Sequence, residues 1–257
     1  MTELLPDLRG VTLVAITSVA LEPTLEALAV SMARARFGKV VLLTDQPRHS
    51  GADPRIDWRR IGRLSSRRDF SRFMLQGLAA HIETDHALCV QWDGFVLDGA
   101  RWNDSFLDFD YIGAPWPHFA DGHNVGNGGF SLRSRRLLEA CAGLPFDGTQ
   151  AEDIVISRLC RPALEQLGIR FAPEALAREF AYERTAPTGR EFGFHGAFNL
   201  VRYLSPGDAL ELYRNLEPQI LARNERWEIL RWAIMHRRPR LALVLLKRLF
   251  SNAGPRG

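Results

Sequence analysis

The sequence predicts an α/β domain followed by a helical C-terminal extension, and two observations support this. Within residues 11–45, a strand, a helix and a second strand follow one another. This is the order of a βαβ unit with a parallel strand pair. From residue 205 onward, apolar residues recur only at helical spacing. We therefore expect one α/β domain over residues 8–200 and a helical extension over residues 205–257.

The N-terminal elements alternate between apolar strands and helices. Residues 11–20 (VTLVAITSVA) are rich in β-branched side chains and predict a buried strand, not a signal peptide. Residues 24–37 have helical spacing and end before Gly38, a residue type common at helix C-caps. Residues 39–45 predict the second strand, and residues 56–64 a short third one.

The next strand ends in polar residues. Residues 69–81 predict a helix, and residues 86–96 a strand whose apolar run stops at Gln91. Open α/β sheets bind ligands at the carboxyl ends of their strands. Asp93 is therefore a candidate site residue, although Asp93-Gly94 is equally typical of a plain turn.

The second half of the domain is loop-rich and then helical. Residues 102–130 read as loops, residues 130–141 as a strand end leading into a helix, and residues 151–168 as another helix. Residues 169–173 predict a short strand, and residues 192–200 a glycine-punctuated loop or strand.

Bulk composition narrows the class of protein. Hydrophobic residues make up 46% and charged residues 25%, as in ordinary globular proteins. The net charge is only +3, and the basic residues of the last third match no recognised nucleic-acid module, so no nucleic-acid partner is expected. Cys89, Cys141 and Cys160 have no metal-ligand spacing and suggest no disulfide framework, which favours a cytoplasmic location.

Five short motifs carry a family resemblance: QWDGF (91–95), DYIGAPW (110–116), VGNGGFSLRSR (125–135), AED (151–153) and FGFHG (192–196). In this order they resemble a family of bacterial domains, long uncharacterised, that look like glycosyltransferases of the GT-A fold. The resemblance implies a Rossmann-like mixed sheet flanked by helices. It also implies a hexosyltransferase-like reaction, moving a sugar from a nucleotide-sugar donor to a glycan or lipid-linked acceptor.

The resemblance also assigns donor and metal residues. The QWD triplet has the spacing of an Asp-x-Asp motif with glutamine in first place. Asp93 would then bind a divalent cation, Mn²⁺ or Mg²⁺, with His195 as a further ligand. Gln91 would contact the donor but would be a weaker metal ligand than aspartate. Thr17 and Ser18, at the end of the first strand, would meet the nucleotide base.

The acidic pair at the start of the later helix is the candidate catalytic group. The resemblance implies that Asp153 is the base of an inverting reaction and that Glu152 orients the acceptor or a neighbouring group. A carboxylate near the acceptor hydroxyl can take its proton as the new bond forms. Acidic residues are also enriched in first helical turns, so simple capping is the alternative.

The VGNGGF loop is the candidate sugar or acceptor pocket. Glycines allow the backbone to pass close to a ligand, so Asn127, Gly128 and Gly129 are expected to wall it. The glycine spacing does not match a dinucleotide fingerprint, and a tight structural turn is the alternative. Trp116 lies between prolines and would stack on a sugar, although aromatic residues more commonly belong to the core.

Residues 226–250 interleave apolar side chains with seven basic residues. This pattern suits helices lying on the inner face of an anionic membrane, near a lipid-linked acceptor. It equally suits an apolar face that packs on the catalytic domain or a partner, leaving the basic residues solvated.

Two other functions stay open. Gln91 in the metal motif is compatible with a non-catalytic module of the same fold that binds nucleotide-sugars or glycans. A hydrolase or nucleotidyltransferase is less well supported, since the sequence has no Gly-x-Ser-x-Gly elbow.

Overall fold

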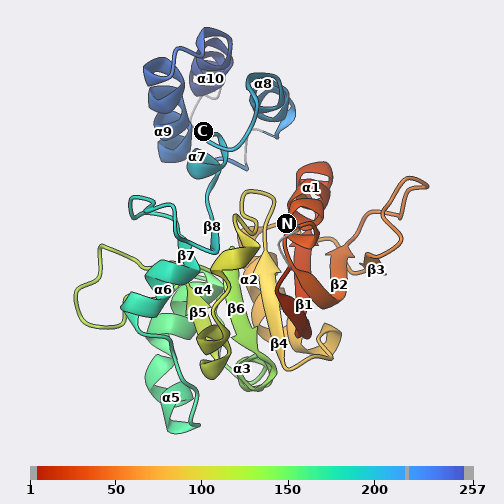
Figure 1. Cartoon of the computed structure of the whole chain (residues 1–257), viewed down its shortest axis with the longest axis vertical. Helices are drawn as coiled ribbons and strands as arrows, with labels where there is room; N and C mark the ends of the chain where they lie inside the picture. Colours follow the sequence, from red (N-terminus) through yellow and green to blue (C-terminus); the bar gives the residue numbers. More distant parts are fainter. Residues whose placement is uncertain (1–4, 218–219, 252–257) are drawn as a thin grey trace. The chain divides into compact units, whose positions relative to one another are not determined.

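The computed structural model describes residues 5–217 and 220–251. The chain divides into two compact units, Met1–His195 and Gly196–Gly257. Figure 1 labels their elements along the sequence.

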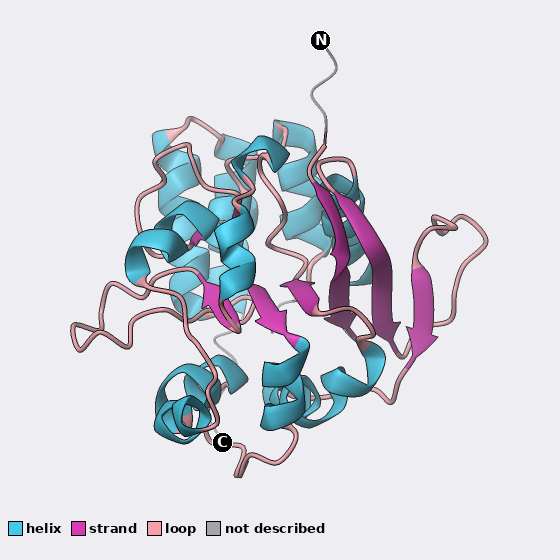
Figure 2. Cartoon of the chain, turned by 60° about the horizontal axis from the view of Figure 1, so that its bottom comes forward, coloured by secondary structure: helices cyan, strands magenta, loops and turns pink. Residues whose placement is uncertain are grey.

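A six-stranded mixed sheet forms the centre of the first unit, and Figure 2 shows its strands in magenta. The strand order is β3-β2-β1-β4-β6-β5. β1 to β4 are mutually parallel, whereas β6 runs antiparallel to both β4 and β5. The strands span β1 Asp7–Thr17, β2 Arg36–Thr44, β3 Asp57–Arg60, β4 His86–Val90, β5 Tyr111–Gly113 and β6 Phe130–Ser134.

Short helices and a second small sheet complete this unit. Its α-helices are α1 Leu21–Met32, α2 Arg67–Arg72, α3 Arg135–Cys141, α4 Glu152–Ile154, α5 Arg161–Gln166 and α6 Glu174–Phe180. A π turn at Phe73–Gly77 and a 3₁₀ turn at Leu78–His81 extend α2, and a π turn at Val155–Leu159 extends α4. Further 3₁₀ turns lie at Gly99–Arg101 and Asp104–Asp108. The small sheet pairs β7 Ala181–Tyr182 with β8 Gly193–Phe194 in parallel.

The two faces of the large sheet carry separate cores because successive strand residues point to opposite sides. Leu13 and Ala15 of β1 pack in a cluster that includes side chains of α1 and α6. Val14 and Ile16 pack on the other face, with side chains of residues 74–82 and α3. Helices therefore cover both faces, and the carboxyl ends of the strands are left for the site.

The second unit is helical: α7 Ala197–Leu200, α8 Pro206–Asn215, α9 Arg223–Met235 and α10 Pro239–Ser251. The buried Tyr213 hydroxyl donates to the Ala197 carbonyl at 2.6 Å. The buried Arg226 guanidinium donates to the Leu221 carbonyl at 3.0 and 3.2 Å. None of the helices in the described ranges combines the length and apolar character that crossing a bilayer demands.

The predicted fold class is confirmed: a mixed α/β sheet is flanked by helices and followed by a helical extension. Three local predictions were wrong. The helix expected over residues 24–37 ends at Met32, and β2 begins at Arg36. Gly38 does not cap α1 but lies inside β2, where a methyl group would come within 2.1 Å of the Arg9 carbonyl oxygen. Residues 169–173 form no regular strand, only a single bridge between Phe171 and Tyr111.

Candidate active site

The central strand of the sheet delivers Asp93 to the carboxyl edge. β4 pairs with β1 and ends at Val90, and the chain then turns, with the Gly94 amide donating to the Gln91 carbonyl at 3.1 Å. Asp93 is only 5% exposed. Its Oδ1 atom is buried and, apart from an ion-pair contact with His195, has no polar partner among the described residues. A buried carboxylate oxygen with so few partners is stabilised by a ligand that satisfies its remaining lone pairs.

His195 reaches the same point from the small sheet. It follows β8, as Glu183 follows β7, and the parallel pairing of these strands places the two residues side by side. His195 Nδ1 lies 3.2 Å from Glu183 Oε1. On the other side of the ring, Nε2 lies 3.3 Å from Asp93 Oδ1 and 3.3 Å from Gln91 Oε1. The structure thus brings together residues 91, 93, 183 and 195.

Two glycines make this approach possible. A methyl group on Gly94 would lie 2.6 Å from the Phe194 carbonyl oxygen. A methyl group on Gly129 would lie 2.0 Å from His195 Nε2. Both positions therefore need a residue without a side chain, and the VGNGGF loop forms one wall of the histidine site.

Asn127 fixes the loop against the histidine. It is 2% exposed and has φ +68°, a left-handed conformation that asparagine tolerates better than most residues. Its Oδ1 accepts hydrogen bonds from the amides of Gly129 at 2.9 Å and Phe130 at 3.2 Å. Its amide nitrogen lies 3.2 Å from His195 Nδ1 and also bonds the Glu183 carboxylate.

The two carboxylates govern the charge of His195. Burial alone would lower the pKa of His195, but Asp93 and Glu183 outweigh it and raise that pKa well above its ordinary value. Burial would conversely raise the pKa of Glu183, and the hydrogen bond from His195 lowers it below its ordinary value. His195 thus lies between two carboxylates, both of which favour its charged form.

The side chains of Asp93, His195 and Gln91 supply some of the ligands that a divalent cation needs. Asp93 Oδ1, His195 Nε2 and Gln91 Oε1 are the carboxylate, imidazole and amide types that such ions accept. Two ligand atoms about 2.1–2.3 Å from one ion lie roughly 3 Å apart at a right angle, close to the spacings seen here. Across residues 5–217 and 220–251, however, no three His, Cys, Asp or Glu side chains are placed to hold a metal. Ligands from outside the protein would have to complete the coordination.

The acidic pair of α4 lies on the other side of the glycine loop. Asp153 Oδ2 accepts the Gly128 amide at 3.1 Å, and its Oδ1 accepts the amide of Ile154 at 2.8 Å. Asp153 is half-buried. The loop thus lies between Asp153 and His195, with Gly128 bonded to the first and Gly129 packed against the second.

Glu152 is buried and contacts a neighbouring side chain. It is 4% exposed and bonds Arg133, whose side chain is fully buried, at 3.1 Å. Burial raises the pKa of Glu152, the charge of Asp153 raises it further, and Arg133 acts in the opposite direction. A methyl group on Gly128 would lie 1.9 Å from Glu152 Oε1. Its contacts are those of a support under the loop.

The remaining predicted residues make local contacts. Trp116 is 5% exposed and lies beneath Gly126, so its indole has no open face for a sugar, contrary to expectation. Thr17 Oγ1 accepts the amide of Ala20 at 3.1 Å, and Ser18 Oγ accepts the amide of Leu64 at 3.0 Å. Both lie at the end of β1, next to the strand that carries Asp93.

Sequence reasoning missed Glu183. It stands in the segment AYERT, whose strand covers only two residues, and no periodicity or motif marks it. The pairing of β7 with β8 is the feature that reveals it.

The chain belongs to a family of proteins of unknown function, described as "Protein of unknown function (DUF5672)", whose model matches residues 58–195. That range contains the Asp93 turn, the glycine loop, the acidic pair and His195.

Comparison with solved structures gives only loose likenesses. The mannosyltransferase PcManGT from Pyrobaculum calidifontis, in complex with GDP-Man and Mn²⁺, is 12% identical over 96% of this chain and 76% of that one, with a TM-score of 0.45. The homologue of Mycobacterium tuberculosis rv0371c from Mycobacterium sp. strain JC1 is 11% identical over 64% of this chain and 84% of that one, with a TM-score of 0.37. No curated protein matches the chain.

Proposed function

We propose that this protein transfers a sugar from a nucleotide-sugar donor to a glycan or lipid-linked acceptor, with inversion and with a divalent cation, Mn²⁺ or Mg²⁺. One observation carries the proposal. The buried Asp93 Oδ1 lies 3.3 Å from His195 Nε2, at the carboxyl edge of the sheet. The ordered motifs that resemble GT-A glycosyltransferases support the same reaction class.

Asp93, His195 and Gln91 would hold the cation. When bound, the cation neutralises negative charge that grows on a diphosphate leaving group. Glu183 accepts the Nδ1 proton of His195 and so presents Nε2 to the ligand side. Thr17 and Ser18 end the neighbouring strand, where we place the nucleotide base.

Asp153 is the proposed base. Its two oxygens accept the amides of Gly128 and Ile154, and a carboxylate retains further lone pairs for an acceptor hydroxyl. The acceptor proton moves to Asp153 as the acceptor oxygen bonds the anomeric carbon. The bond from that carbon to the diphosphate oxygen breaks, and its electron pair leaves on the diphosphate. Asn127, Gly128 and Gly129 would wall the sugar, and Glu152 would hold the loop in place with Arg133.

A non-catalytic module that binds nucleotide-sugars or glycans is the second candidate. Gln91 stands where the resemblance has an aspartate, and its amide oxygen already contacts His195 Nε2 at 3.3 Å. An amide is a weaker ligand for a hard cation than a carboxylate.

Calorimetry with Mn²⁺ and nucleoside diphosphates, followed by assays of diphosphate release from nucleotide-sugars, separates the two. Cation-dependent binding and release, both lost in Asp93→Asn, are the results expected of a transferase. Binding without release from any donor would support the module. Absence of nucleotide binding in the presence of Mn²⁺ would exclude the transferase and a module that binds nucleotide-sugars.

The place of action is part of the proposal. We infer a cytoplasmic enzyme whose C-terminal helices contact the inner face of the membrane. Trp227, Ile234, Met235 and Leu243 are exposed on α9 and α10, among basic residues. Flotation with anionic liposomes, comparing the full chain with one ending near Leu221, tests the contact. Equal recovery of both chains away from the lipid would remove it.

A further inference from the structure

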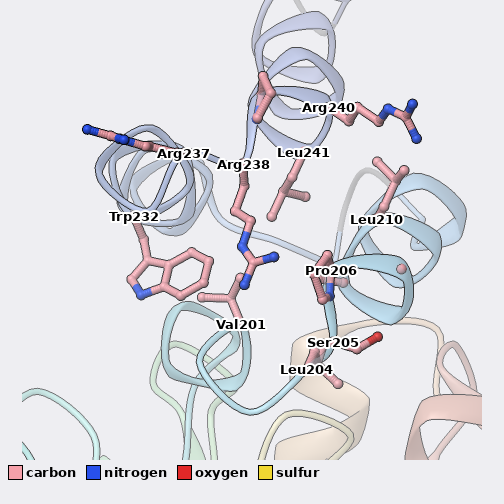
Figure 3. Close-up of a pocket in the computed structure, with 13 residues that line it drawn as sticks. Val201, Leu204, Ser205, Pro206, Leu210, Trp232, Arg237, Arg238, Arg240 and Leu241 are labelled. Atoms are coloured by element: carbon pink, nitrogen blue, oxygen red, sulfur yellow. The ribbon is translucent and has the colours of Figure 1, made fainter.

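The C-terminal unit contains a cavity that the proposed transfer reaction does not use. Its volume is about 320 Å³, and the ends of α7, α8, α9 and α10 surround it (Figure 3). This volume lies at the lower end of the range for ligand pockets, about 300–1,000 Å³. All of its lining residues belong to residues 201–241 of the second unit.

The charge of the lining is entirely positive. Arg237, Arg238 and Arg240 line the cavity, and no aspartate or glutamate does. Within the described residues, none of the three guanidinium groups has a hydrogen-bonding or ion-pair partner. Figure 3 shows the Arg238 guanidinium pointing into the cavity, between Val201 and Leu241, while Arg237 and Arg240 point away from its centre.

The backbone adds to this positive character. Both α8 and α10 begin at the cavity, since Pro206 and Gly207 of one helix and Pro239 and Leu241 of the other line it. Helix N-termini carry partial positive charge that favours phosphate groups. At α8 this charge is offset, because Asp208 lies in the first turn and its amide donates to Ser205 Oγ at 3.2 Å. The start of α10 has no acidic residue and therefore favours the same kind of ligand as the arginines.

Apart from Ser205, the other side chains of the wall are apolar. Its apolar side chains come from every one of the four helical segments: Val201, Leu204, Leu210, Trp232 and Leu241. Leu241 is 3% exposed, and Trp232 and Leu210 are half-buried. A bare inorganic anion would leave this surface unused, and an uncharged apolar molecule would leave the Arg238 guanidinium desolvated without a partner.

We propose that this cavity binds the phosphate end of a lipid, with the phosphate on Arg238 and the first part of the hydrocarbon chain against Leu204, Leu210 and Leu241. Arginine forms charge-assisted hydrogen bonds with phosphate. Burial of the hydrocarbon chain against the apolar side chains adds to the binding affinity. The inference does not depend on the sugar-transfer reaction, because it concerns only residues of the second unit and is tested by binding alone.

Calorimetry on the full chain tests the site with three probes: decyl phosphate below its micelle-forming concentration, inorganic phosphate, and uncharged decyl maltoside. We expect decyl phosphate to bind at a single site at least about tenfold more tightly than either other probe, a difference of about 1.4 kcal/mol. Equal affinity for inorganic phosphate would show an anion site without a lipid component and would overturn the proposal. Equal affinity for decyl maltoside would overturn it as well.

Three variants locate the site. Arg238→Gln should weaken decyl phosphate binding by about tenfold or more, while Arg223→Gln, an exposed arginine at the start of α9, should leave it unchanged. Leu210→Gln should weaken decyl phosphate but not inorganic phosphate. Circular dichroism and melting curves establish that each variant is folded. A folded Arg238→Gln or Leu210→Gln chain with native affinity for decyl phosphate would refute the assignment.

Discussion

Substitution of Glu183 should weaken divalent-cation binding while leaving the fold intact. Glu183 Oε1 accepts from His195 Nδ1 at 3.2 Å, so the carboxylate fixes the ring orientation and leaves Nε2 facing Asp93. Such supporting partners typically contribute 10–100-fold to metal affinity. Glu183→Gln keeps an acceptor and loses the charge, whereas Glu183→Ala loses both. We therefore expect losses of about tenfold and about a hundredfold in Mn²⁺ affinity, respectively, which correspond to about 1.4 and 2.8 kcal/mol.

Electron paramagnetic resonance of free Mn²⁺, titrated with protein and a nucleoside diphosphate, measures this affinity without requiring turnover. Glu179→Gln is the matched control, because Glu179 is an exposed acid on α6 that accepts a hydrogen bond from the Asn103 side chain at 3.4 Å. Native Mn²⁺ affinity in Glu183→Ala would refute the role of the carboxylate. If Glu179→Gln lost as much Mn²⁺ affinity as Glu183→Ala, the loss would reflect the general effect of removing a negative charge and not a specific role of Glu183.

Four further predictions test the site and the fold. Asp93→Asn should abolish cation-dependent release of nucleoside diphosphate in a chain that melts as the native protein does, and persistent release would remove Asp93 as a ligand. Asp153→Asn should lower transfer by roughly 10²–10⁴-fold while donor binding, measured by calorimetry, is kept; near-native transfer would make Asp153 a support for the loop only. Arg136, Ser134 and a backbone amide outweigh burial and lower the pKa of Asp110, so its stabilisation is present above its unfolded pKa and is lost as pH falls through the folded one. Asp110→Asn should therefore cost about 1–3 kcal/mol in urea unfolding at neutral pH, and progressively less as the pH is lowered below about 4; a cost that does not change with pH would contradict the reasoning. Arg237 follows His236, the C-cap of α9, and has φ +54°, so Arg237→Gly should raise the free energy of unfolding by about 1 kcal/mol, and no gain would show that the turn is unstrained.

The sheet was predictable because its strands are buried on both faces. Val11 to Thr17 and residues 40–44 are nearly continuous apolar runs rich in β-branched residues, which are typical of the interior strands of a covered sheet. Gly38 shows where this reasoning stops. A glycine after a helical pattern is usually a cap, but here α1 ends at Met32 and the glycine makes room for the Arg9 carbonyl. Only the strand register reveals that contact.

The positions of the candidate site residues were only partly accessible from sequence. Asp93 follows an apolar run, and that alone locates it at a strand end. Trp116 has the neighbours of an exposed residue, prolines on both sides, yet the loop folds back over it and Gly126 packs on its ring. Burial of an aromatic residue in a loop depends on where the returning chain lies, which local sequence does not encode.

The residues around His195 show why the rest required the structure. Asn127, Glu183 and His195 are brought together by a loop in a left-handed conformation and by a pair of two-residue strands. Elements this short have no detectable periodicity. The sequence therefore shows that these residues exist but does not predict that they lie next to one another. The resulting contacts are nevertheless specific. A side chain at position 94 would collide with the backbone of Phe194, next to His195, and a side chain at position 129 would collide with the ring of His195. An alanine at Gly129 would collide with the imidazole itself. The glycine loop is thus better explained as space for the histidine than as a turn, since a turn alone would not require Gly129 to lack a side chain.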